Sequence, residues 1–536
     1  METAYQSDLP LPLEIVTLIC STLPKPDLLR LRLVTHRLHD AATPFAFREF
    51  YLRAYGTAAT NFTSIATSAR LRNYVKEITI DTNIGQDYEY ASNESYEFPS
   101  GFFNALPSLR YFSKLTNLHL RFSKYCGDNR REFEWAWIEE DWPFRYRILD
   151  TVSHCIVGLW TRAKQVEIDE RADLRDFKAR YLDDDPEFIA KCAEHLQELT
   201  ISNLADYHDP NLASSKAWQQ LLRLPRLQDL KLLVTTEYHR SQHQIRSPQE
   251  RHEFFQKLPS TWLSPSLGNC LRTLSLYYTE YWGWFPRMNL YEIGMLPQLK
   301  VLALGQYVFT DKRQTDWIAT IGNSNGSGGL EELYLDDCPI LFKARQHSPL
   351  TSDGYPDLRA VLKANYATTV TKEYNIRWHN VLETWRGRMK GLKKFIMGHG
   401  DWPSQWPSTK ALKEHEGFVY LSYDELSQMF SENVHRNFCK PAGVEVSNTK
   451  DPVLARRYLH GAGLLQRRTA RMQYIKYDIG MCGPWDNPYP TRGRGRPDDG
   501  WAPEKKTVGV DDAAYELLMA TIRDRISGDE KYQNGE

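Results

Sequence analysis

The chain has 536 residues, of which 41% are hydrophobic and 25% are charged, with a formal net charge of -1 at pH 7. This length allows several domains, or one small domain followed by a long repeat array. A chain so close to neutral is not built to attract polyanions along its whole surface. We therefore expect neither nucleic acid nor a membrane as a partner.

No stretch approaches the roughly 18 consecutive apolar residues of a membrane span. The first residues, METAYQSDLPLPLEI, lack the basic and apolar regions of a secretory signal. The eight cysteines occur singly, without a C-x-x-C pair, so neither a zinc site nor a disulfide framework is indicated. These features predict a protein of the cytoplasm or nucleus, with no metal and no cofactor.

The first fifty residues predict a compact helical unit. Pro12 suits the first position of a helix, and Ile15, Leu18 and Ile19 form one apolar face. Pro26 and Asp27 begin a second helix. Its apolar residues recur at three- and four-residue spacing, at Leu28, Leu31, Val34 and Leu38, and Pro44 is expected to end it. A core of this size gives only marginal stability, so we expect the unit to be stabilised by contact with a partner or with the next domain.

The same residues resemble an F-box, in the form that opens many fungal F-box proteins. The resemblance rests on LPLEI (11–15) and DLLRLRLVTHRLHDAATPFAFREFYL (27–52), with Leu38 or a neighbour replacing the usual tryptophan. In that family the motif docks on a Skp-type adaptor and, through it, on a cullin. The resemblance implies adaptor contacts at Leu11, Pro12, Ile15, Ile19, Leu28, Leu31, Val34 and Leu38. The alternative is that these residues only form the core of a helical hairpin.

The middle of the chain repeats the pattern apolar-x-x-apolar-x-apolar. It occurs as VKEITI (75–80), LTNLHL (115–120), AKQVEI (163–168), LQELTI (196–201), LQDLKL (227–232), LRTLSL (271–276), LKVLAL (299–304), LEELYL (330–335) and LKKFIM (392–397). Each copy predicts a short strand with a helix-compatible segment after it, for example 183–195 and 211–224. In LEELYL, Leu333 and Leu335 are expected to point inward, and Glu332 and Tyr334 outward.

Leu-Pro pairs at 106–107, 224–225 and 296–297 predict turns ahead of strands. Together with the strand pattern, they resemble the irregular leucine-rich repeats that follow F-boxes in many substrate receptors. Stacked units of this kind build one continuous core and a curved surface. A nonrepetitive α/β domain is the alternative.

Two segments between strands are rich in Trp and Tyr: EFEWAWIEEDWPFRYR (132–147) and YYTEYWGWFPR (277–287). Such residues either form a binding surface or pack over the core, and their large rings favour packing. MQYIKYDIG (472–480) predicts one further strand. AAYELLMATIRDRI (513–526) predicts a capping helix, with Tyr515, Leu518, Met519 and Ile522 at helical spacing.

Motifs of catalysis are weak. Ser324 stands in a G-x-S-x-G pattern, but the Ser-Gly-Gly that follows favours a flexible linker over a nucleophile elbow. His239 and His243 lack the glutamate of H-E-x-x-H. Basic clusters at 467–471 and 492–496 favour a solvated face, with RNA, an acidic partner or nuclear import as alternatives. We expect no catalytic and no metal-binding residue.

The sequence thus predicts an α/β protein in which an all-helical F-box (1–55) precedes an irregular leucine-rich-repeat solenoid of parallel strands with helices (60–400). A continuation or cap of the array (401–486) and a Pro-, Gly- and charge-rich loop with a terminal helix and tail (487–536) complete the chain. The expected function is the substrate-recognition subunit of a Skp–cullin–F-box ubiquitin ligase, binding a protein target that the sequence does not identify. The alternative is a non-catalytic binding scaffold outside ubiquitination.

Overall fold

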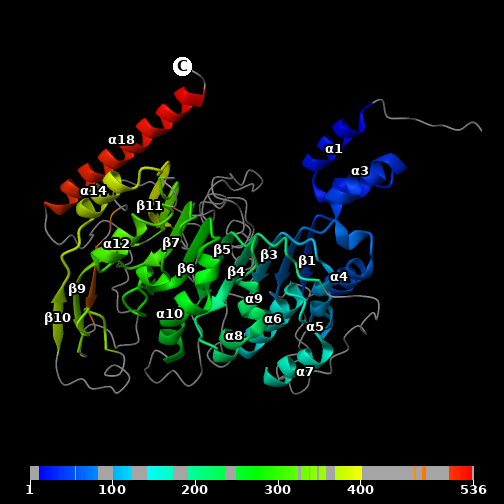
Figure 1. Ribbon diagram of the computed structural model, residues 1–536, viewed down its shortest axis with the longest axis horizontal. Helices are drawn as coiled ribbons and strands as arrows, with labels where there is room; N and C mark the ends of the chain where they lie inside the picture. Colours follow the sequence, from blue (N-terminus) through cyan, green and yellow to red (C-terminus); the bar gives the residue numbers. More distant parts are fainter. Residues whose placement is uncertain are drawn as a thin grey trace, which may run out of the picture.

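The computed structural model of the chain describes residues 11–54, 56–82, 100–122, 142–172, 191–235, 249–323, 328–336, 338–346, 349–357, 369–400, 464–465, 472, 474–478 and 506–533. Figure 1 shows strands side by side through the middle of the molecule. A small helical unit lies beyond one end of them, and a long helix lies along the other. The protein is therefore an α/β protein with a helical extension at its amino-terminal end.

The large sheet contains ten strands, which lie in the order in which they occur along the chain. They are β1 (Glu49–Arg53), β2 (Glu77–Asp81), β3 (Asn117–Arg121), β4 (Glu198–Ala205), β5 (Asp229–Thr235), β6 (Thr273–Trp282), β7 (Val301–Tyr307), β8 (Glu332–Asp336), β11 (Lys394–Gly400) and β12 (Leu464–Leu465). Neighbouring strands from β1 to β8 and on to β11 are parallel, and β12 is antiparallel to β11. Sequential addition of parallel strands is the topology of a solenoid-like array.

Helices and 3-10 turns fill the connections along the array. They are α4 (Ala58–Thr67), η1 (Leu71–Asn73), α5 (Ser100–Ala105), η2 (Leu106–Tyr111), α6 (Trp142–Ile156), α7 (Arg162–Arg171), α8 (Pro210–Ser214), α9 (Lys216–Leu221), α10 (Gln249–Thr261), α11 (Pro265–Gly268), η4 (Leu290–Ile293), α12 (Lys312–Ile318) and α14 (Trp378–Arg388). Apolar strand residues and most of these helices share one hydrophobic core, which runs from Leu52 on β1 to the carboxy-terminal helix. Every unit thus buries its leucines against the next one, as a repeat array requires.

Backbone hydrogen bonds join each unit to its predecessor at the point where the strand begins. The amide of Lys76 donates to the carbonyl of Arg48 at 2.8 Å, and that of Thr116 donates to the carbonyl of Lys76 at 2.8 Å. The series continues without a break through Gln197, Gln228, Arg272, Lys300, Glu331 and Lys393. This ladder fixes the residues before neighbouring strands at the strand spacing of about 4.8 Å.

Eight of the nine repeated segments form strands of this sheet, and the predicted strands are confirmed there. The prediction for AKQVEI (163–168) is wrong, because these residues lie in helix α7. The hydroxyl of Thr161 caps that helix by accepting from the amide of Lys164, and Gln165 and Ile168 are buried three residues apart. Helical spacing and a cap therefore outweigh the strand-like pattern.

Three smaller expectations are corrected. The single second helix predicted from Pro26 to Pro44 is wrong, because Thr35 caps a new helix and the stretch divides into α2 (Lys25–Leu31) and α3 (His36–Ala46). Helix α3 also continues two residues beyond Pro44, since the amide of Phe47 still donates to the carbonyl of Thr43 at 3.1 Å. Leu333 and Leu335 point into the core as expected. Tyr334 lies on the opposite face but is 1% exposed, because it packs in a second apolar cluster with Leu233, Tyr277 and Ala303.

The expected helices and turns are found in part. Residues 211–224 contain α8 and α9, whereas 191–195 of the segment 183–195 are not helical and its earlier residues lie outside the described part. Leu224-Pro225 and Leu296-Pro297 precede β5 and β7, while Leu106-Pro107 begins the 3-10 helix η2. In the aromatic segments, Trp142, Trp282 and Trp284 are buried, so packing over the core is confirmed for them. Residues 132–141 lie outside the described part.

A second, three-stranded sheet lies near the carboxy-terminal end of the array. It contains β9 (Ile340–Gln346), β10 (Val370–Glu373) and β13 (Tyr474–Asp478), in the order β10-β9-β13. The strand predicted at 472–480 is thus confirmed at 474–478, but it pairs with β9 rather than with the large sheet. Trp284, just after β6, packs in one apolar cluster with Leu341 of β9 and Tyr477 of β13, and its indole donates to the carbonyl of Gly354 at 3.0 Å.

The last described helix, α18 (Thr507–Gln533), covers helix α14 at the end of the array. Tyr515, Leu518 and Ile522 are buried in the common core, which confirms the predicted capping helix. Asp511 accepts from the amide of His379 at 2.9 Å and from the hydroxyl of Tyr474 at 2.7 Å. The cap therefore joins α14, β13 and α18 through one buried carboxylate.

Candidate protein-docking surface

The N-terminal helical unit, residues 11–46, has a core of its own. It consists of α1 (Leu13–Thr22), α2 (Lys25–Leu31) and α3. Its buried residues are Val16, Cys20, Leu28, Leu38, Ala41, Ala42 and Ala46, and they form a cluster separate from the core of the array. Three alanines on α3 let the other helices approach closely. The unit therefore buries its apolar residues in its own core, and it is not buried beneath the sheet.

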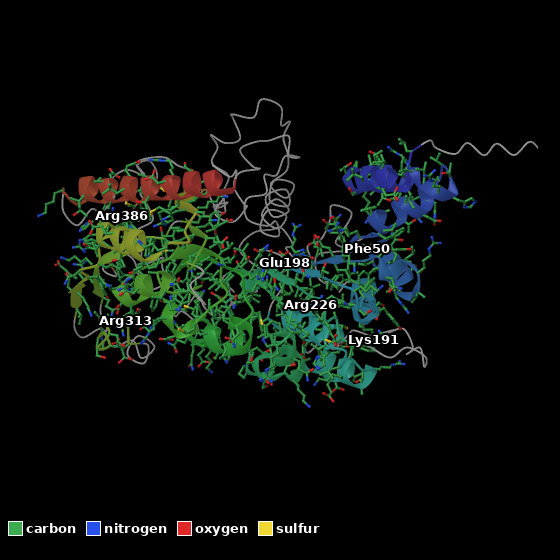
Figure 2. All side chains as sticks on the ribbon, turned by 45° about the horizontal axis from the view of Figure 1, so that its top comes forward. Phe50, Lys191, Glu198, Arg226, Arg313 and Arg386 are labelled. Carbon is green, nitrogen blue, oxygen red and sulfur yellow. The ribbon has the colours of Figure 1, made fainter. Side chains whose placement is uncertain are left out.

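Hydrogen bonds from side chains to backbone carbonyls hold this unit together and attach it to strand β1. The guanidinium of Arg37 donates to the carbonyl of Leu11 at 2.6 Å, which ties α3 to the start of α1. Lys25 donates to the carbonyl of Glu49 at 2.8 Å and lies 5.2 Å from the ring centre of Phe50. Figure 2 shows Phe50 where the unit meets the sheet, with the helices extending away from it.

The outer surface of the unit is unusually apolar. Sixteen large hydrophobic residues are exposed in the described part of the chain. Eight of them fall within 24 residues, and we call this set the apolar face: Leu11, Leu13, Ile15, Leu18, Ile19, Leu29, Leu33 and Val34. Leu33 is 87% exposed and Leu18 is 63% exposed, so these side chains are surrounded by water. Exposed hydrophobic groups at this density mark a contact surface.

The eight residues predicted from the sequence divide between this face and the core. Leu11, Ile15, Ile19 and Val34 belong to the apolar face, and the exposed Pro12 lies beside them. Leu31 is half-buried against the core of the unit. Leu28 is 3% exposed and Leu38 is 8% exposed, so their side chains support the surface from below.

Four residues of the apolar face were missing from the predicted set: Leu13, Leu18, Leu29 and Leu33. Leu13 and Leu18 could have been predicted from the sequence, because α1 carries apolar residues on two faces. Val16 and Cys20 point inward, while Ile15, Leu18 and Ile19 point outward. A short helix that is apolar on nearly all sides is expected to have protein on both sides.

The face of the large sheet opposite its leucines carries charged side chains on β2 to β5. Lys231 donates to Glu198 at 2.5 Å, and the amide group of Asn117 donates to the same carboxylate at 2.7 Å. Arg121 and Asp81 form a second buried pair at 3.3 Å. The charges of both pairs are thus matched across neighbouring strands of the array.

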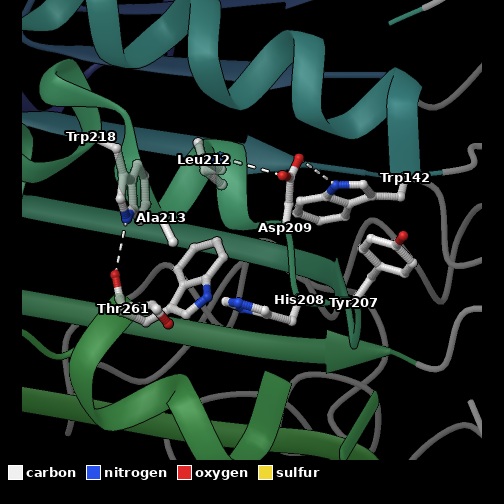
Figure 3. Close-up of a pocket in the computed structure, with 9 residues that line it drawn as sticks. Trp142, Tyr207, His208, Asp209, Leu212, Ala213, Trp218 and Thr261 are labelled. Atoms are coloured by element: carbon white, nitrogen blue, oxygen red, sulfur yellow. Dashed lines mark hydrogen bonds between the residues drawn. The ribbon is translucent and has the colours of Figure 1, made fainter. Parts of the chain in front are cut away.

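A small hollow lies between α6, α8 and α10 (Figure 3). Asp209 accepts from the indole of Trp142 at 2.8 Å and caps α8, while the indole of Trp218 donates to the carbonyl of Thr261 at 3.0 Å. Burial, and then the nearby Lys257, lower the pKa of His208. The enclosed space is about 10 Å³, room for roughly one water molecule. This hollow is too small for an organic substrate.

The structure bears on only some of the metal, cysteine, membrane and catalytic features considered from the sequence. No group of three metal-ligating side chains occurs among the described residues. Within that part, the cysteines at 20, 155, 192, 270 and 338 are free. The residues described also contain no helix that is both long and apolar enough to cross a membrane. Ser324, His239, His243 and the basic clusters at 467–471 and 492–496 lie outside the described residues.

No protein-family model matches the chain, and no curated protein matches its sequence. The apolar face is therefore the feature on which a functional conclusion depends.

Proposed function

We propose that this chain is the substrate-recognition subunit of a Skp–cullin–F-box type ubiquitin ligase. In this proposal the apolar face docks a Skp-type adaptor, and the array binds a protein target in the cytoplasm or nucleus. The observation that carries it is that half of the large hydrophobic residues exposed in the described part of the chain lie within residues 11–34. The resemblance of the same residues to an F-box supplies the identity of the partner.

The separate core of the N-terminal helical unit supports this assignment. Leu28 and Leu38 hold the helices together, so the apolar face is not needed to stabilise them. Water around eight large apolar side chains is unfavourable by about 25 cal/mol for each Å² of apolar surface. Burial of this surface against a partner would recover that free energy. The chain itself would add proximity and orientation, while a conjugating enzyme supplies the bond-forming chemistry.

Substituting Ile15→Asp or Leu18→Asp is expected to weaken adaptor binding by about 30-fold or more. A central apolar contact contributes roughly 2 kcal/mol, and a charge placed there must also be desolvated. Both side chains are exposed, so the fold should be unaffected. The measurement is binding of the purified full chain to a purified Skp adaptor by titration calorimetry, with thermal unfolding recorded for each variant.

Met295→Asp is the matched control, because Met295 is an exposed apolar residue on the array, far along the chain from the apolar face. It should bind the adaptor like the unchanged chain. Unchanged adaptor binding by Ile15→Asp and by variants of Leu11 and Pro12 would count against the proposal. If the adaptor binds but no cullin joins the complex, the chain is instead a scaffold acting outside ubiquitination.

A further inference from the structure

The residues that precede each strand of the large sheet form one continuous edge. The backbone ladder places them at intervals of about 4.8 Å, one for each strand. Arg48 precedes β1 and Lys76 precedes β2, and the corresponding turn before β3 contains Lys114. Before β5, β6 and β7 stand Arg226, Arg272 and Lys300. We call these six residues the basic strip.

Two members of the strip reach the turn before a neighbouring strand. Lys76 donates to the carbonyl of Lys114 at 3.4 Å, so its ammonium group reaches the next turn. Arg226 likewise contacts the ring of His195, in the turn before β4, at 3.1 Å. Burial, and then the charges of Lys114 and Arg48, lower the pKa of Lys76. The positive charges of Lys76, Lys114 and Arg48 are therefore near enough to repel one another.

Acidic side chains near the strip are mostly engaged elsewhere. Glu77 lies 3.4 Å from the ring of His119, and Glu198 binds Lys231. Among the residues that the structure describes, Lys300 is the one member of the strip with an ion pair, to Glu331 at 3.2 Å. Glu194 is exposed beside His195 and offsets one charge at most. Asp229, at the start of β5, attracts Arg272, and the exposed Glu49 follows Arg48. Among the described residues, Arg48, Lys76, Lys114 and Arg226 form no ion pair, so these four cations are available to a negative partner.

We propose that the basic strip binds an acidic, extended segment of a partner protein. From Arg48 to Arg272 the strip spans five strand intervals, or about 24 Å. An extended peptide rises about 3.4 Å per residue, so the strip fits a segment of about seven residues. The net charge of -1 for the whole chain does not favour nucleic acid over a protein. That the partner is a ligase target rests on the proposed function, but the binding itself does not.

The test uses the full chain and a fluorescein-labelled eight-residue peptide of alternating Glu and Ser, measured by fluorescence anisotropy. We expect saturable binding that weakens as salt rises from 50 to 300 mM, because the attraction is between exposed charges. The same peptide with Gln in place of Glu should not bind. The double variant Arg226→Glu/Arg272→Glu should weaken binding of the acidic peptide at least tenfold.

The double variant Lys312→Glu/Arg313→Glu is the matched control, since it changes the net charge equally on helix α12. An equal loss of binding in this control would overturn the inference, because it would reveal attraction to overall charge alone. Tighter binding of an eight-nucleotide single-stranded RNA than of the peptide would also overturn it. Adaptor binding is measured in parallel: a chain that binds adaptor but no peptide refutes only this inference, and the reverse result refutes only the proposed function.

Discussion

Substituting Lys231→Ala is expected to lower the free energy of unfolding by about 3–5 kcal/mol, because it leaves the buried charge of Glu198 without its cation. The side chains of Lys231 and Glu198 are 1% and 6% exposed, and their charged atoms are 2.5 Å apart. Asn117 and Thr200 still donate to the carboxylate, but neither neutralises it. Urea unfolding at pH 7, followed by circular dichroism, measures the change.

The exposed pair Lys312–Asp316 supplies the comparison, since its charged atoms are also 2.5 Å apart but its side chains are 68% and 31% exposed. Lys312→Ala should cost less than about 1 kcal/mol, because water screens the pair. The double variant Glu198→Gln/Lys231→Met should be more stable than Lys231→Ala, since position 198 no longer carries a buried charge that lacks its cation. Equal losses at Lys231 and Lys312 would show that burial does not govern this interaction.

Acidification from pH 7 to pH 5 is expected to destabilise the array by about 2 kcal/mol through His252. His252 lies on α10 and is 1% exposed, with its ring 4.8 Å from that of Phe285. Neither ring nitrogen has a hydrogen-bond partner among the described residues. Burial, and then the charge of Arg251, lower its pKa from 6.5 to about 3.

The direction follows from comparing the two states. The unfolded chain protonates His252 near pH 6.5, whereas the folded chain resists protonation until about pH 3. The contribution to stability is complete above pH 6.5 and is lost as the pH falls from there toward 3. Urea unfolding of the unchanged chain and of His252→Phe at pH 7 and pH 5 measures it.

In His252→Phe, the difference in unfolding free energy between the two pH values should shrink by about 2 kcal/mol. His36→Phe, at an exposed position on α3, should keep the full difference. If His252→Phe retains the pH dependence of the unchanged chain, His252 is not the source of the loss of stability at low pH.

The strands of the large sheet were predictable because their leucines repeat at a fixed local spacing. Leu302 and Leu304 alternate with polar or small residues, and the ladder repeats this arrangement in each unit. Strand β1 was not predicted, because EFYLR falls inside the segment that resembles an F-box. The pairing of β13 with β9 was also beyond prediction, since a local pattern does not specify a partner about 130 residues away.

The candidate docking surface was predictable in its location but not in its orientation. Helix α1 has apolar residues on two faces, and spacing alone does not tell which face turns inward. The structure resolves this through Ala42 and Ala46 on α3, which are small enough for Val16 and Cys20 to pack against. The bulkier Ile15 and Leu18 are left on the other side, in contact with solvent.

The order of synthesis has a consequence at the far end of the array. Trp385 and Phe395 are covered by Tyr515 and its neighbours on α18, which are translated more than a hundred residues later. Until those residues emerge from the ribosome, the last parallel strands expose an uncovered apolar end. A nascent chain at that stage would be vulnerable to aggregation and would be a natural client for chaperones.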